Sequence, residues 1–541
     1  MKIGTLIGQH QSNETDIQNI SVLNSTISNS NISGGLVGLS QNSIKIYSCI
    51  ITINISSKQN CGGIIGESYI FVKIQNCKVI DSILSSYYTG GYIGQLNSSV
   101  QFLKCSQTSL TIQSTCNAGG LIAITTSNDS IQIDCTHIEK IYIEVILTQY
   151  SAAGLIGVSS AYVFVNNTKV QNVTISSLNT AALIGYQMQN YKQEANLNQI
   201  TIVNINLYTH FSSGICIGLL ETQMSARHIN ISITNQNQSV RSSAGFVGKI
   251  TSNSQYVSSF VNSSIRESVI QSQSYVGGII GETMSNIHID NCLTNQLVII
   301  SDINCAGFIG SSQSSLSNIN ITQSIVLNSS ILSNSDYSVG GIIGITISNV
   351  SVTNISVKYV NITAQFANIG GAGAAGIIGK ADIAIIINCS VEYIIINSVN
   401  QASAGLVGLS QLNLTIINSS IKNSVINNND SIHNYSTGGI IGVSNNTVLI
   451  DNCMISDCIM NSITFSGSFI GMQLKNSSIQ ILNSQIQTIQ MKCTRCGIVS
   501  GNIQLESYTV KNSSSSGQNY INGNIMNNCV SFDVLTNMNG C

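Results

Sequence analysis

Residues 62–83, which read GGIIGESYIFVKIQNCKVIDSI, contain the pattern that decides the fold. Their first five residues form a signature of two small residues, two apolar residues and a final glycine, Gly66. A second block follows about ten residues later: an apolar residue, a variable residue, Asn, and then Cys or Ser, here Ile74 to Cys77. Short runs of alternating apolar and polar residues accompany both blocks, as is typical of β-strands. The stretch therefore reads as one unit of a β-structured repeat.

The signature recurs along nearly the whole chain. Successive copies lie 28 to 35 residues apart, and about sixteen or seventeen copies can be counted. Self-similarity at such a period is typical of solenoids. Glycine permits positive φ or a close approach of two backbones, so we expect these glycines where each turn bends. The structural glycines that we assign are Gly38, Gly66, Gly94, Gly157, Gly248, Gly281, Gly310, Gly344, Gly379, Gly408 and Gly442.

The repeat predicts an all-β fold, a single-stack parallel β-helix of about 16–17 turns with three short strands per turn. Each strand becomes stable by pairing with its counterpart in the next repeat, and the stack buries a continuous core of Ile, Val and Leu. Asn tolerates the left-handed conformation at bends. Leucine-rich repeats are the alternative, but their period is shorter and their Leu skeleton is missing. We expect the β-helix over residues 1–501 and an atypical C-terminal turn or cap over 502–541.

Composition limits the function. Of 541 residues only 8% are charged, the net charge is −2, and 43% are apolar, so the chain can bury a core but offers no basic surface for nucleic acid. No apolar run approaches the ~20 residues that span a bilayer. The N-terminus shows no signal peptide. Because Gly4 already belongs to a signature, we expect a chain that lacks its N-terminal cap.

Sixteen cysteines are present, and many share one position of the second block, where other repeats have Ser or Asn. This pattern predicts a ladder of small, half-buried side chains in which Cys and Ser are interchangeable. Neighbouring turns could also bring equivalent cysteines within disulfide range. The consecutive set that we assign to the ladder is Cys49, Cys77, Cys105 and Cys135.

Cys493 and Cys496 form a lone C-x-x-C pattern, followed only by Cys529 and Cys541. Zinc sites usually need a second pair of ligands, and no His lies nearby in the sequence. We interpret this group as a terminal cluster that pins the last turns. The sequence predicts no metal site and no cofactor.

We also find no catalytic site. Polysaccharide-cleaving β-helices need carboxylates, or a carboxylate with Arg or Lys, that converge from adjacent turns, with paired acids about 5–9.5 Å apart. Asp134, Asp290 and Asp451 share a position but belong to distant repeats. An enzyme would have to assemble its site from loops of the longer repeats near Gly218 or Gly379, and this carbohydrate-active enzyme is the alternative hypothesis.

The signature together with the Ile-x-Asn-Cys/Ser block resembles the GLUG-motif repeats of bacterial and protist surface proteins, which include spacer regions of some secreted proteases. The resemblance covers residues 4 to about 501. It implies an extracellular or cell-surface location and adhesin-like roles. We therefore expect a non-enzymatic surface or secreted β-solenoid, an adhesive scaffold or extended spacer whose amide- and hydroxyl-rich faces contact glycans or host or cell-surface proteins; the residues that bind them are not indicated.

Overall fold

The computed structural model describes residues 1–147, 149–189, 194–239, 241–251, 256–335, 337–365, 372–429, 436–474, 478–497, 499–502, 507–516, 518–522 and 524–526. The chain divides into two compact units, Met1–Gln271 (unit 1) and Ser272–Cys541 (unit 2). Over the described ranges both units are built of β-strands, and no helix occurs. In each unit parallel strands are stacked as a β-solenoid, with about 16 turns in the two units together, which confirms the predicted fold class.

One turn of unit 1 illustrates the architecture. It consists of β8 (Ile65–Ser68), β9 (Val72–Gln75), β10 (Lys78–Ser86) and β11 (Tyr88–Gly90). The next turn repeats the order with β12 (Ile93–Leu96), β13 (Val100–Leu103), β14 (Ser106–Ser114) and β15 (Ala118–Gly119). A turn thus has four strand segments where the sequence pattern predicts three, because the Gly-Gly pair bends the chain between β11 and β12.

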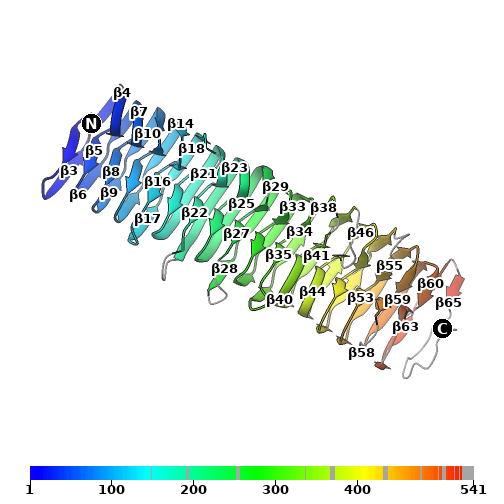
Figure 1. The fold of residues 1–541 in the computed structure, drawn as a ribbon. Helices are drawn as coiled ribbons and strands as arrows, with labels where there is room; N and C mark the ends of the chain where they lie inside the picture. The colour runs from blue at the N-terminus through cyan, green and yellow to red at the C-terminus, as the bar shows by residue number, and fades with distance from the viewer. Residues whose placement is uncertain are drawn as a thin grey trace. The chain divides into compact units, whose positions relative to one another are not determined.

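From β1 (Lys2–Gly4) onward the strands pair in parallel with their counterparts one turn away, and the last described strand, β65 (Asn524–Met526), is the exception. Equivalent strands such as β4 (Ser21–Gly34), β7 (Ile50–Gly62), β10 and β14 lie side by side within unit 1 (Figure 1). The register places like residues over one another, as with Ile46, Ile74, Phe102 and Ile133, all fully buried. Burying such a side chain contributes about 1.5–3 kcal/mol. The apolar residues of the alternating runs in the sequence are therefore the residues of each strand that face the interior.

The signature glycines permit close backbone packing. A Cβ atom added to Gly63 would lie 2.2 Å from the carbonyl oxygen of Gly91, and one added to Gly66 would lie 2.6 Å from that of Gly38. Neither glycine has φ in the left-handed region. Of the two roles expected for these glycines, the structure therefore supports close approach at the bend.

Left-handed residues form the other bends, and Asn is the commonest of them. In the turn described above, Asn76 and Asp81 have φ of 53° and 44°. The equivalent pair in unit 2, Asn418 and Asn423, has φ of 51° at both residues. The expectation that Asn supports the bends is confirmed, because Asn adopts this conformation at less cost than most residues.

A buried side chain follows each of these bends and bonds the turn before it. The Ser82 hydroxyl accepts a hydrogen bond of 3.0 Å from the backbone N–H of Ile53 and donates one of 2.8 Å to the carbonyl oxygen of Ile80. An unpaired buried backbone group costs about 1–3 kcal/mol. A small hydroxyl or thiol at this place completes the backbone hydrogen bonding where the bend interrupts it.

The stack continues past residue 501, the predicted end of the repeats. In unit 2, β62 (Ser507–Lys511) pairs in parallel with β58 (Ser478–Leu482), and β63 (Ser514–Ser516) pairs with β59 (Gln485–Lys492). The last described strands, β64 (Asn519–Ile521) and β65 (Asn524–Met526), pair antiparallel. Residues 527–541 of the predicted cap, with Cys529 and Cys541, lie outside the described residues.

Candidate functional site

Cys49, Cys77 and Cys105 lie on successive turns, and all three are buried, free thiols. The backbone N–H of Cys49 donates to the sulfur of Cys77 at 3.5 Å, and the Cys77 thiol donates to the carbonyl oxygen of Gln75 at 3.3 Å. Ser324 makes the same two bonds in unit 2, from the N–H of Cys292 at 3.0 Å and to the carbonyl of Thr322 at 2.7 Å. The ladder therefore has a structural role in which Cys and Ser are equivalent.

Burial makes these thiols poor nucleophiles. Desolvation raises the pKa of Cys105 to about 11, and it does the same for Cys389 and Cys453 in unit 2. The thiolate is the reactive form of cysteine. At neutral pH the thiols of Cys105, Cys389 and Cys453 are therefore protonated. Cys49 differs from them, because hydrogen bonding to the Cys77 side chain lowers its pKa to about 7.

Cys135 is not part of the ladder, contrary to the sequence-based assignment. It is exposed and occupies the left-handed bend itself, with φ of 51°. Thr136, which is buried, fills the ladder position, as shown by the pairing of its successor His137 with Ser106. The reason is that this repeat reads Ile-Asp-Cys without the intervening Asn, so its Cys comes one residue early.

The shared aspartates bond to neighbouring polar side chains. Asp134 accepts a hydrogen bond of 3.1 Å from the Asn166 amide, and Asp290 accepts one of 2.6 Å from the Thr322 hydroxyl. Asp451 accepts one of 2.9 Å from the amide of Asn483. Within the described ranges, no group of three or more His, Cys, Asp or Glu is close enough to hold a metal ion.

One carboxylate and one guanidinium come together near Gly218. Glu194 begins β23 (Glu194–Gly214), which pairs with β25 (Gln223–Ser239), and a groove of about 390 Å³ is lined by Glu194, Arg227 and His228 among others. Burial raises the pKa of Glu194, and the charge of Arg227 opposes this only in part. Among the described residues of the long repeat near Gly218, Glu194 and Arg227 are the pair that most resembles a catalytic acid and base.

The region near Gly379 offers less. Burial lowers the pKa of Lys380, and the nearby charge of Asp382 partly opposes the shift. Residues 366–371, which include Gly370 and Gly371 of this long repeat, lie outside the described part of the chain.

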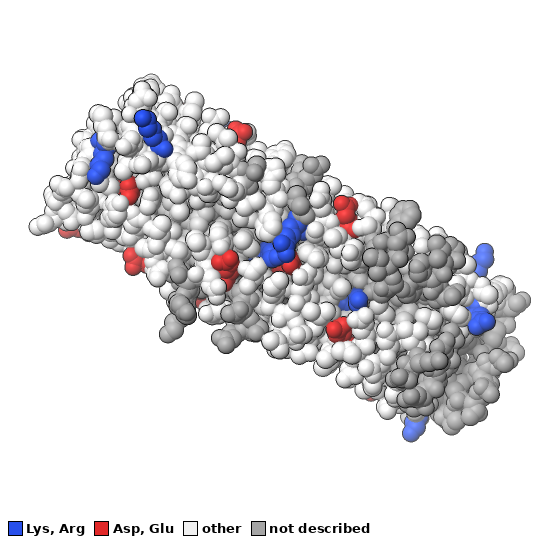
Figure 2. Space-filling view, viewed as in Figure 1, with Lys and Arg blue, Asp and Glu red and all other residues white. Residues whose placement is uncertain are grey.

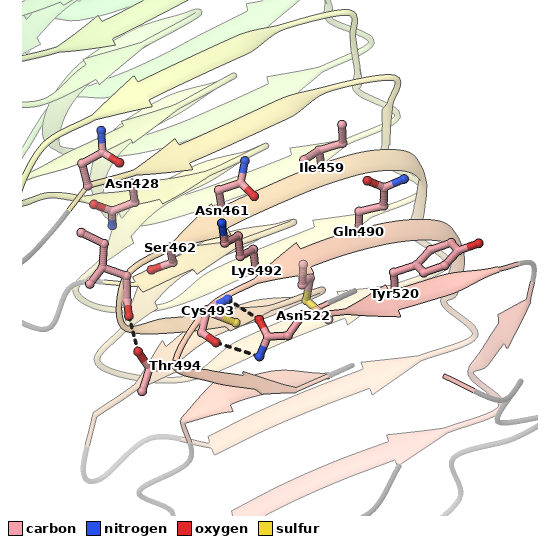
Figure 3. Close-up of a pocket in the computed structure, with 13 residues that line it drawn as sticks. Asn428, Ile459, Asn461, Ser462, Gln490, Lys492, Cys493, Thr494, Tyr520 and Asn522 are labelled. Carbon is pink, nitrogen blue, oxygen red and sulfur yellow. Dashed lines mark hydrogen bonds between the residues drawn. The ribbon is translucent and has the colours of Figure 1, made fainter. Parts of the chain in front are cut away.

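A broad groove lies on the outer face of unit 2 (Figure 3). It has a volume of about 1070 Å³. Asn461 lines it and is the last member of a ladder of amides that extends beyond the groove, in which Asn427 donates to Asn397 and Asn461 donates to Asn427, both at 2.9 Å. Lys492 continues the row after Asn461. Gln490 lies in the same strand as Lys492, and Tyr520 pairs with Gln490 from the neighbouring strand β64. The lining is therefore mostly uncharged and rich in hydrogen-bonding groups.

The bend beside this groove is fixed by Cys493. It forms a disulfide with Cys496 inside a single turn, which differs from the predicted pinning of several turns by a cysteine cluster. Asn522 clamps the same residue, since its side-chain oxygen accepts from the N–H of Cys493 and its amide donates to the Cys493 carbonyl, both at 3.0 Å. The groove thus has a covalently restrained edge.

Charged groups are sparse on the surface. Figure 2 shows isolated Lys, Arg, Asp and Glu side chains separated by wide uncharged areas. Several of them neutralise one another between turns, as do Lys45 with Glu14 in unit 1 and Lys358 with Glu392 at 3.2 Å in unit 2. The exposed strands consequently present amides, hydroxyls and scattered apolar side chains.

No family model matches the chain, and comparisons with curated proteins and with solved structures likewise find no match. Among the residues that the structure describes, no helix has the length and apolarity needed to cross a membrane.

Proposed function

We propose that this chain is a GLUG-type repeat protein that acts at the cell surface or in secreted form as a non-enzymatic adhesive scaffold or extended spacer. The observation that carries the proposal is the outer surface: uncharged amide ladders on strands that a filled interior holds in place. The sequence resemblance supports the family and the location, and the fold supports the mechanical role.

Ordered amides favour adhesion for an energetic reason. The side chains of Asn397, Asn427 and Asn461 already bond to one another, so a ligand that contacts them does not have to immobilise them. Each rotamer-rich side chain that is fixed on binding costs about 0.5–1.5 kcal/mol. A pre-ordered row of donors and acceptors suits the hydroxyls of a glycan or the exposed polar groups of another surface protein.

The test combines binding with location. The purified chain is applied to an array of glycans and cell-surface proteins, and intact cells are probed with an antibody against it. We expect retention on the array and surface labelling. Removing the amides in the unit 2 groove with Asn461→Ala and Gln490→Ala should weaken binding, whereas Asn204→Ala, in a ladder of unit 1 with Asn172, serves as a control. Blank arrays together with a purely intracellular signal would contradict the adhesive role.

The groove of Glu194 and Arg227 favours a second candidate, a carbohydrate-active enzyme. A carboxyl group with a raised pKa beside a guanidinium can exchange a proton with a sugar ring and stabilise developing negative charge. Incubation with a panel of polysaccharides, followed by assay of reducing ends and unsaturated products, distinguishes the two. Product formation that is abolished in Glu194→Gln would establish the enzyme, and its absence with retained binding would support the scaffold.

A further inference from the structure

A second groove, in unit 1, lies outside the regions described above. Its volume is about 570 Å³, and its lining comes from both sides of the Gly-Gly bend. Asn60, at the end of β7, and Glu67, in β8, meet across this bend with a hydrogen bond of 3.0 Å between the amide nitrogen and the carboxylate. The close approach of backbones at the signature glycines thus creates a concave outer corner.

The carboxylate of Glu67 is held firmly in this corner. It is only 5% exposed and also accepts from the Asn97 amide at 3.5 Å. Asn60 donates in addition to Gln95 at 3.1 Å, and Gln95 donates to Asn97 at the same distance. Hydrogen bonding between the Tyr69 hydroxyl and the Glu67 carboxylate raises the pKa of Tyr69.

The fold does not require this polar network. In the register of β5 (Val37–Ser40), β8, β12 and β16 (Ile122–Thr125), Glu67 pairs with Leu39 and Gln95 pairs with Ile124. The turns before and after therefore place aliphatic side chains where this part of unit 1 places an acid and an amide. Burying a carboxylate is costly unless it is hydrogen-bonded, and the amides of Asn60 and Asn97 supply those bonds here. A polar network that the stack does not need, at the wall of an outer groove, indicates a site built for a polar ligand.

Aromatic side chains border the same groove. Tyr69, Tyr87 and Tyr88 line it, and the rings of Tyr87 and Tyr88 pack edge to face at 4.8 Å. Tyr69, Ile70 and Phe71 are consecutive and 50%, 38% and 38% exposed. The backbone hydrogen bonds between turns identify the residues at the same place in the neighbouring turns. They are Gln41, Asn42 and Ser43 in the preceding turn and Asn97, Ser98 and Ser99 in the following turn. A run of three exposed apolar residues is unfavourable unless it serves a contact.

We propose that this groove binds a segment of a neutral oligosaccharide, an inference that rests on the adhesive function proposed above and gives it a site in unit 1, separate from the amide-rich groove of unit 2. The hydroxyls of a pyranose donate to the carboxylate of Glu67 and exchange hydrogen bonds with the amides of Asn60 and Gln95. Its apolar C–H face packs against the tyrosine rings, whose edges and faces suit such contacts. Lys2 also lines the groove and offsets the charge of Glu67, which favours a neutral ligand.

The same geometry predicts binding without cleavage. Glycoside hydrolysis commonly needs two carboxyl groups about 5–9.5 Å apart, and Glu67 is the only acid that lines this groove among the described residues.

The test uses the full chain and an array of neutral hexasaccharides of glucose, mannose, galactose and N-acetylglucosamine, with choline and a lysine-rich peptide as cationic probes. We expect at least one hexasaccharide to bind, and saturation-transfer NMR to show contact at its ring C–H protons. Tyr69→Ala should weaken binding at least tenfold, as should Glu67→Gln, which preserves the shape of the side chain. Tyr142→Ala removes another exposed tyrosine of unit 1, 43% exposed, and should leave binding unchanged.

The outcomes separate the two proposals. Tyr69 is largely exposed, so its variant should keep the wild-type circular dichroism spectrum and report on binding even where Glu67→Gln affects folding. Binding that survives in Tyr69→Ala and Glu67→Gln would overturn the groove while leaving the adhesive function standing. A chain that labels the cell surface but binds no hexasaccharide would also overturn the groove and leave a spacer. If only the cationic probes bound, the groove would be a site for an ammonium group, and the assignment to an oligosaccharide would be overturned.

Discussion

The inner and outer faces of one turn, residues 65–90, differ in how closely they follow the repeat. On the inner face Val72, Ile74 and Cys77 are buried and lie in register with Val100, Phe102 and Cys105 of the next turn. On the outer face the exposed run of residues 69–71 has polar counterparts on both neighbouring turns. The repeat therefore fixes the residues that face the interior, whereas the outward-facing residues of a single turn can differ from those of its neighbours.

The physical reason is that apolar side chains of neighbouring turns pack against one another on the inner face. A solenoid turn contacts only its neighbours, and protein interiors are packed too closely to tolerate a missing or oversized side chain. Outer side chains project into solvent and have no such constraint. Binding sites in this molecule should therefore be sought where an outer residue departs from the repeat.

The largest effect that tests this comparison is expected at a signature glycine. Gly66→Ala places a Cβ atom 2.6 Å from the carbonyl oxygens of both Gly38 and Ser33. Because these are backbone atoms of the neighbouring turn, relief requires the turns to separate, and we expect a loss of about 3–5 kcal/mol in the free energy of unfolding. Urea unfolding followed by circular dichroism measures it.

Gly8→Ala is the matched control for this substitution. Gly8 occupies the same place in its own signature, but an added Cβ atom there would lie 3.1 Å from its nearest neighbour, the carbonyl oxygen of Lys2. We expect a loss below about 1 kcal/mol. Equal losses in the two variants would mean that the close approach at Gly66 is not what constrains the residue.

A smaller effect is expected from the cysteine ladder at alkaline pH. Burial raises the pKa of Cys105 to about 11, whereas an unfolded thiol has a pKa of about 8.5. The unfolded chain loses this proton first, so the free energy of unfolding is unaffected below about pH 8.5. The contribution of Cys105 to it then falls by about 1.4 kcal/mol per pH unit as the pH rises toward 11, and Cys389 and Cys453 add contributions of the same sign.

Cys105→Ser removes this titration and should make stability less dependent on pH, as measured by urea unfolding between pH 7 and pH 10.5. Ser already fills the position in other turns, as Ser324 does. Cys135→Ser changes an exposed thiol at a bend and should keep the wild-type pH dependence. If Cys105→Ser retained the full alkaline slope, the ladder thiols would not be the groups that titrate.

Much of the fold could be predicted because it depends on local, repeated signals. The alternation around Ile74 and Val79 defines an inner face, and Asn76 indicates the bend. The error at Cys135 shows the limit, since this repeat has Cys at the bend position and Thr136 at the ladder position, and the apolar pattern around them is unchanged. Register must be counted from the inner residues rather than from the cysteine.

The unit 1 groove could not be predicted in the same way. It depends on Asn60 meeting Glu67 across a bend whose tightness follows from backbone contact between turns. The sequence did contain one signal, the run Tyr69-Ile70-Phe71, which interrupts the polar residues found at this place in neighbouring repeats. A search for departures from the repeat, rather than for catalytic motifs, would have found it.

The smallest effect on stability, and the sharpest test of the comparison, is expected from replacing this run by the residues of the preceding turn. The triple variant Tyr69→Gln, Ile70→Asn and Phe71→Ser reproduces Gln41, Asn42 and Ser43 on an unchanged interior. These side chains are substantially exposed. We therefore expect the free energy of unfolding, measured with urea, to change by no more than about 0.5 kcal/mol. Hexasaccharide binding, measured on the same samples, should be lost. A loss of stability as large as that of Gly66→Ala would mean that the outer face supports the stack, and that its departure from the repeat serves folding rather than recognition.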